Sequence, residues 1–158
     1  AQFYLGLMYK NGEGVAQDDE QAVTWYSKAA AQGNLIAQNN LVSIAEQGNA
    51  TAQLYLGKMY ENGEGVIQDY VQAVTWYRKA AEQGNAAARN NLGVMYNNDK
   101  NFIHDNVYAH MWWNIGGSLG DTDASTRRDN LAKEMTAADI AKAHKLAREC
   151  VRNSYKGC

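Results

Sequence analysis

The strongest constraint on the fold of this chain is an internal repeat. Residues 1–41 align with residues 52–92 without a gap, and most of the aligned positions are identical. The clearest copy, residues 52–85, reads AQLYLGKMYENGEGVIQDYVQAVTWYRKAAEQGN, and a further copy begins 36 residues after Ala52, at Ala88. Self-similarity at a period of about 20 to 50 residues is typical of stacked repeat architectures. We therefore predict an array of similar units.

Each copy predicts two helices joined by a turn. In residues 52–85 the apolar side chains of the first helix recur three and four positions apart, which places them on one helical face. Gly63 and Gly65 predict its end, because glycine readily adopts the left-handed conformation that closes a helix. The second helix is predicted to begin near Asp69, a residue type that caps helices, with Gln72 three positions on. We expect its buried face to contain Val71, Val74, Tyr77, Ala80 and Ala81, with Trp76 at the flank.

A glycine inside the first helix recurs as Gly6, Gly57 and Gly93. An interior glycine costs a helix about 1 kcal/mol relative to alanine. Its recurrence therefore indicates that a neighbouring helix packs against the missing side chain. The three tryptophans at one repeat position, Trp25, Trp76 and Trp112, are likewise assigned to packing between hairpins rather than to a ligand.

Composition supports helices and excludes several classes of protein. The chain has 158 residues, is 46% hydrophobic and contains no proline, which favours an all-helical domain. No run approaches the roughly 18 apolar residues of a membrane span, so no membrane insertion is expected. The net charge is −2. Basic residues outnumber acidic residues only in residues 127–158, where the two kinds are mixed. That distribution lacks the basic stripe typical of proteins that bind nucleic acid, so we expect no nucleic-acid partner.

The repeated motifs resemble a known family. LGKMYENGEGV, QDYVQAVTWYRKAAEQGNAAA and their copies are similar to Sel1-like repeats, relatives of the tetratricopeptide repeat, over residues 1–34 and 52 to about 120. The resemblance implies an all-α fold, an α-α superhelix or solenoid of stacked antiparallel helix hairpins. It also implies a protein that binds other proteins, commonly as an adaptor.

One segment departs from the regular period. A first helix begins again near Ala37, but the AEQGN signal that ends a second helix already follows at Ala45, so much of a normal repeat is missing. Residues 35 to about 47 have room for one helix where the family has two. We expect a break in the superhelix there, unless the chain near Gly48 bends to restore the phase. The alternative is a join or a gap in the sequence.

The last copy is eroded and the chain then ends in two further helices. In place of the Gly63 turn this copy has Asp99-Lys100-Asn101-Phe102, which is typical of a terminal repeat. Thr136 predicts the start of a final capping helix that extends to about Asn153. The predicted single domain of 158 residues comprises a repeat (1–34), a shortened single-helix half-repeat (35–51), a repeat (52–85), a degenerate repeat (86–120) and C-terminal capping helices (121–158).

The sequence contains no pattern typical of an active site or metal site. His104, His110 and His144 lack metal-ligand spacing and are predicted to be polar surface residues. The turn glycines follow helices rather than strands, which argues against a phosphate-binding loop. We predict no catalytic residue, no metal and no cofactor. The runner-up function, hydrolysis of a small substrate such as a β-lactam, is attributed to some secreted relatives and has no support in these residues.

The two cysteines, Cys150 and Cys158, allow a local disulfide at the C-terminal end of the chain. Cysteine pairs at this spacing are known in a secreted, cysteine-rich bacterial group of the family that the chain resembles, although within its repeats. Such a bond would place the protein in an oxidising compartment, periplasmic or secreted. The alternative is a cytoplasmic protein with two unpaired thiols.

The resemblance places a binding surface on the concave side of the superhelix, lined by exposed positions of the first helices. Amides at these positions can pair with the backbone of an extended peptide, and Lys58 with a carboxylate. We therefore predict a protein or peptide partner, while ordinary solvated surface is the alternative for each residue. The predicted contact residues are Phe3, Leu7, Lys10, Asn11, Leu54, Lys58, Glu61, Asn62, Asn90, Val94, Asn97 and Asn98.

Overall fold

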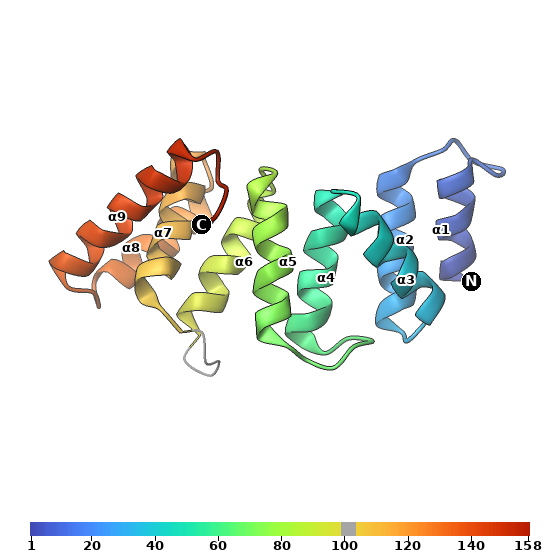
Figure 1. The fold of residues 1–158 in the computed structure, drawn as a ribbon, viewed down its shortest axis with the longest axis horizontal. Coiled ribbons are helices and arrows are strands. Elements are labelled where there is room, and N and C mark those ends of the chain that lie inside the picture. The colour runs from blue at the N-terminus through green and yellow to red at the C-terminus, as the bar shows by residue number, and fades with distance from the viewer. Residues whose placement is uncertain (99–103) are drawn as a thin grey trace. The chain divides into compact units, whose positions relative to one another are not determined.

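The computed structural model describes residues 1–98 and 104–158, and in these residues it is helical, with no strand. The chain divides into two compact units, residues 1–80 and 81–158. Unit 1 contains α1 (Gln2–Asn11), α2 (Asp19–Ala31), α3 (Leu35–Glu46), α4 (Ala50–Asn62) and most of α5 (Tyr70–Glu82) (Figure 1). Unit 2 contains α6 (Ala86–Asn97), α7 (Asn106–Ser118), α8 (Thr122–Ala132) and α9 (Ala137–Arg152). Within each unit adjacent helices pack together, which confirms the predicted all-α class.

The predicted caps are present at the predicted positions. Asp18 and Asp69 cap α2 and α5, and the Asp69 carboxylate accepts hydrogen bonds from the backbone N–H groups of Val71 and Gln72. Gly63 closes α4 in the left-handed conformation, with φ 72°. These caps act within one turn of each helix end, so they depend on the local sequence. The predicted turn at residues 99–102 lies outside the described residues.

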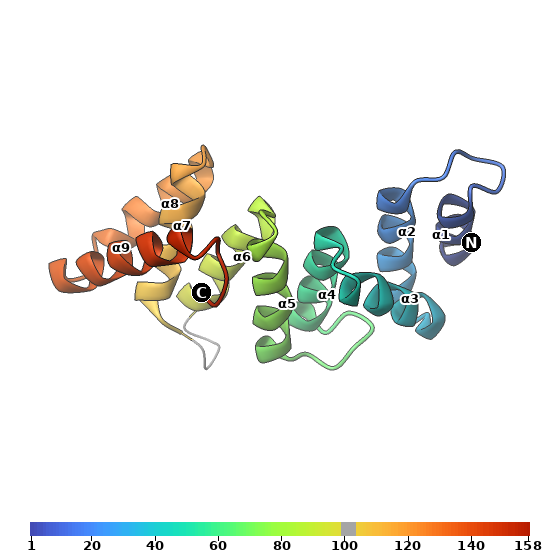
Figure 2. The same cartoon turned by 45° about the horizontal axis from the view of Figure 1, so that its top comes forward.

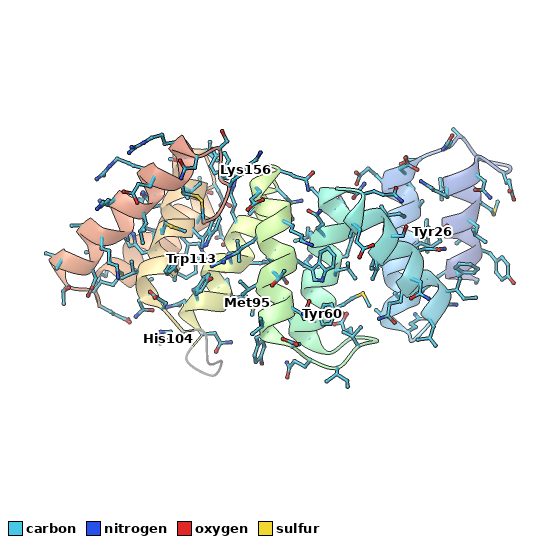
Figure 3. All side chains as sticks on the ribbon, in the orientation of Figure 1. Tyr26, Tyr60, Met95, His104, Trp113 and Lys156 are labelled. Atoms are coloured by element: carbon cyan, nitrogen blue, oxygen red, sulfur yellow. A yellow bond between two sulfur atoms is a disulfide. The ribbon has the colours of Figure 1, made fainter. Side chains whose placement is uncertain are left out.

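The three helix-interior glycines each admit an aromatic ring from the second helix of the same hairpin. A Cβ built on Gly6 would lie 2.6 Å from Cδ1 of Tyr26, and one on Gly57 or Gly93 would collide with the ring of Tyr77 or Trp113. The packing role predicted for these glycines is confirmed. Figure 3 shows Tyr26 between α1 and α2, where its ring packs against Gly6.

The core of unit 1 consists of small and medium-sized side chains from α2, α3, α4 and α5, with Tyr26, Trp76 and Tyr77 as its large members. Most of the face predicted for α5 is buried, but Val71 was assigned to it wrongly and is 48% exposed. At about 100° per residue, Val71 lies roughly opposite the fully buried Ala73, so it cannot share that face.

A single helix, α3, connects the first hairpin to α4. Both α3 and α4 pack against α2 as well as against each other, and Figure 2 shows α3 beside α2 and α4. In unit 2, α8 and α9 both pack against α7. Thus α4 packs against α2, as α9 packs against α7. The two cases differ in sequence, because α4 has the sequence of a first helix whereas α9 is a second helix. The break in superhelix direction predicted at this segment stays a prediction.

Candidate functional site

A groove of about 260 Å³ lies among α1, α2 and α3 in unit 1. Apolar and polar side chains both line it, and the residues are Leu7, Lys10, Tyr26, Asn40, Ser43, Ile44 and Gln47. Pockets that hold a segment of a ligand are usually largely apolar, with a few polar groups that fix its orientation. This groove combines the apolar side chains of Leu7 and Ile44 and the Tyr26 ring with four polar side chains, so its polar share is larger.

The sequence of α3 explains why the groove presents polar groups on one side. Ala37, Leu41 and Ala45 recur four residues apart and are fully buried in the core. Asn40, Ser43 and Gln47 recur three and four residues apart, so they form a second stripe that faces the groove. The amphipathic pattern of α3 therefore separates a packing face from a hydrogen-bonding face.

The groups in the groove are held in place by contacts within unit 1. The Lys10 ammonium lies 3.0 Å from Oδ1 of Asp19, and the Gln47 amide donates a hydrogen bond of 3.3 Å to Oγ of Ser43. Burial raises the pKa of the Tyr26 hydroxyl, against the opposing effect of a hydrogen bond with the Asn40 side chain. Tyr26 is therefore neutral at physiological pH, and the groove offers neutral donors and acceptors beside one paired ammonium.

Two of the predicted contact residues, Leu7 and Lys10, line this groove. Lys58 and Asn62 line a second hollow of about 280 Å³ between α2 and α4, which also includes Lys28 and Glu64. Phe3 borders a third hollow at the start of α1. Five of the predicted residues of unit 1 therefore lie along three hollows rather than in one site.

Other predicted contact residues are occupied by internal bonds. Glu61 accepts a hydrogen bond from the Tyr77 hydroxyl, Asn90 accepts one of 3.1 Å from the Trp113 indole, and Asn97 donates one of 3.1 Å to Asn106. Asn11 donates to Glu13 at 2.8 Å. Leu54 is buried at 9% exposure. The remaining two residues lie at the C-terminal end of α6 or beside it, Val94 half-buried and Asn98 exposed.

The prediction missed the polar residues of α3, although the sequence contained the signal for them. A shift of 36 residues places Ser43 in register with Leu7, and Gln47 in register with Asn11. Ser43 and Gln47 both line the groove. The predicted set drew only on residues 1–34, 52–85 and 86–120 and did not extend to the half-repeat, although a first helix is predicted to begin near Ala37.

His110 was predicted to lie on the surface, and that prediction is wrong. It is 2% exposed on α7, its ring centroid lies 5.3 Å from that of His144 on α9, and its Nδ1 has no hydrogen-bond partner. The reason is tertiary, since α8 and α9 both pack on α7. The pKa of His110 is lowered to about 4, chiefly by burial and also by His144 and Arg128, against the opposing effect of Asp129.

The described residues hold no cluster of three or more His, Cys, Asp or Glu side chains that is able to bind a metal ion. Cys150 and Cys158 form a disulfide with a Cα–Cα distance of 5.6 Å. In the described part of the chain, no helix has the length and the apolar character that a membrane crossing requires.

Comparison with known proteins gives a consistent result. The family model of the Sel1 repeat matches residues 1–34, 50–85 and 86–121. A protective antigen present in uropathogenic Escherichia coli strains, displaying an SLR fold, is 32% identical with a TM-score of 0.65; the match covers 98% of this chain and 38% of that protein. A Sel1 repeat protein from Oxalobacter formigenes is also 32% identical, with a TM-score of 0.52, and 82% of this chain matches 86% of it. This chain thus spans well under half the length of the first of these relatives. The SLR fold agrees with the predicted α-α superhelix.

Proposed function

Because the chain belongs to the Sel1 repeat family, we propose that it is a non-catalytic protein-interaction module that binds an extended segment of a partner protein. The observation that carries this proposal is the groove of unit 1, to which α1 contributes Leu7 and Lys10 and α3 contributes Ser43 and Gln47. In unit 1 the residues predicted on α4 stay proposed contacts. In unit 2 the residues predicted on α6 are proposed to contribute less, because two of its amides bond internally.

The chemistry of the groove defines the segment that fits it. Leu7 and Ile44 offer apolar surface for one side chain of the partner, and about 260 Å³ accommodates a side chain with its flanking backbone. The amides of Asn40 and Gln47 are able to exchange their internal hydrogen bonds for bonds to a peptide backbone. The proposed ligand is therefore an extended peptide with an apolar anchor residue between polar neighbours.

The groove is tested by placing a photo-crosslinking residue at position 43 and, in a separate protein, at position 72. Gln72 is exposed on α5 outside the groove and provides the matched control. We expect position 43 to capture a defined segment of a partner from a native extract and position 72 to capture none of it. The captured segment is then synthesised, and its Kd is measured by calorimetry.

We expect Ser43→Arg, which fills the groove, to weaken binding of that peptide about tenfold or more, a loss of ~1.4 kcal/mol. Gln72→Arg introduces the same charge and should leave Kd unchanged. Equal affinities for the two variants would contradict the groove assignment. Binding through another surface would instead appear as capture from position 72.

We also propose that the protein works in an oxidising compartment, such as a bacterial periplasm, and that residues 1–158 act as one repeat domain. The disulfide between Cys150 and Cys158 supports the first of these proposals. Protein isolated from its own compartment under acid quench should show no alkylation at either cysteine by mass spectrometry. Alkylation of both thiols would place it in a reducing compartment.

A further inference from the structure

The C-terminal segment 153–158 folds back on unit 2 after α9 ends. Its backbone reverses at Ser154 and Tyr155, with φ 54° and 65°, a conformation that residues with a Cβ disfavour. Backbone hydrogen bonds hold the reversal, from Tyr155 N–H to the carbonyl of Cys150 at 2.8 Å and from Ser154 N–H to that of Val151 at 3.1 Å. The disulfide then ties Cys158 to Cys150. We call this segment, which includes Lys156 in Figure 3, the strap.

The strap covers one charged side chain. The Tyr155 ring lies 4.3 Å from the guanidinium carbon of Arg89 on α6, and Arg89 is only 5% exposed. Its Nε has no hydrogen-bond partner, and burial lowers the pKa of its guanidinium. Leaving a buried polar group unpaired is costly, and stacking on an aromatic ring compensates only in part. Exposure to water would therefore be more favourable for the Arg89 guanidinium than for an apolar side chain, because water can hydrogen-bond to its unpaired Nε.

A further contact joins the strap to the start of unit 2. Gly157 N–H donates a solvent-exposed hydrogen bond of 3.2 Å to the carboxylate of Glu82, a half-buried residue. A small cavity of about 120 Å³ remains beneath the strap, lined on the helix side by Tyr108, Met111, Leu146 and Glu149. A segment with an unfavourable backbone conformation, a solvent-exposed hydrogen bond to Glu82 and a cavity beneath it depends strongly on its covalent tether.

We propose that residues 153–158 are a redox-released strap: the Cys150–Cys158 disulfide holds them over Arg89, and its reduction by a dithiol exposes Arg89 while α6 to α9 stay folded. The inference is independent of the groove in unit 1.

The chemistry of release is thiol–disulfide exchange. A thiolate of the dithiol attacks Sγ of Cys158, which is more exposed than the 3% exposed Cys150, and the Cys150 thiolate leaves and takes up a proton. The second thiol of the reductant then displaces Cys158. Two electrons and two protons pass to the protein, and the reductant becomes a disulfide.

The test measures how fast phenylglyoxal, an arginine-specific dicarbonyl, modifies Arg89, by peptide mass spectrometry. Arg127, whose side chain is 45% exposed, is the internal reference. We expect slow modification of Arg89 in the oxidised protein and an increase on the order of tenfold or more after dithiothreitol treatment. The Cys158→Ser variant should show the same increase without reductant, and the rate at Arg127 should not change.

Two matched measurements make the result decisive. Tyr155→Ala with the disulfide intact should expose Arg89 in part, because it removes only the stacking ring. Far-UV circular dichroism and the fluorescence of the buried Trp112 and Trp113 should be the same in the oxidised and reduced proteins. Continued protection of Arg89 after reduction would overturn the proposal. A loss of helix content would also overturn it, because the disulfide would then stabilise the fold of unit 2 as a whole instead of holding the strap alone.

Discussion

Replacing Gly65 by alanine is expected to lower the free energy of unfolding of unit 1 by about 3 kcal/mol. Gly65 has φ 72°, and a Cβ there would collide with the carbonyl oxygen of Ala30 at the end of α2. The left-handed conformation costs alanine about 1 kcal/mol, and the overlap with rigid backbone adds about 2 kcal/mol. Urea unfolding followed by circular dichroism measures the loss.

Gly14 provides the matched control, since it occupies the same repeat position in the first hairpin. Its φ is 74°, but the nearest atom to an added Cβ is the flexible Cε of Met8 at 3.6 Å. Gly14→Ala should therefore cost only the conformational part, about 1 kcal/mol. Equal losses for the two variants would show that the contact between the Gly65 turn and α2 contributes nothing.

Acidification from about pH 6.5 to pH 4 is expected to cost unit 2 about 3 kcal/mol through His110 alone. Its pKa is about 4 in the folded protein and ordinarily 6.5. Between these values the unfolded chain binds a proton at His110 and the folded chain does not, so stability falls as the pH falls. Each pKa unit of difference corresponds to about 1.4 kcal/mol.

His110→Leu should flatten the dependence of unfolding free energy on pH by this amount, whatever its effect at neutral pH. Unfolding of unit 2 is followed by the fluorescence of Trp112 and Trp113 in a protein whose two unit 1 tryptophans, Trp25 and Trp76, are replaced by phenylalanine. His104→Gln is the control, because it removes an exposed histidine instead of the buried one. A His110→Leu slope equal to that of the parent protein would exclude His110 as the source.

The features that could be predicted from the sequence are those fixed by neighbouring residues. Helix ends follow from Asp69, Gly63 and their equivalents because a cap acts within one turn. The glycine contacts were also predictable, since an interior glycine is unfavourable unless another helix needs the space. The cysteine pair was close enough in sequence for the disulfide to be expected from spacing and family resemblance.

The features that could not be predicted depend on which helices meet. His110 looks like any polar helical residue until α8 and α9 cover α7. Leu54 and Asn90 occupy positions predicted to be exposed, yet one is buried and the other binds the Trp113 indole. The groove depends on where the side chains of α3 lie relative to α1, and that placement is a tertiary result.

The way in which α3 is inserted has a consequence for how such a chain can change in length. The tripeptide Gln-Gly-Asn precedes α3, α4 and α6, each time with a left-handed glycine and an asparagine whose side chain accepts a hydrogen bond from the backbone three residues on. A segment that is gained or lost between two such tripeptides leaves every remaining helix with its cap. A single helix can then be added or removed, because the same Gln-Gly-Asn connection precedes each of these helices and no helix is left with an uncapped N-terminus.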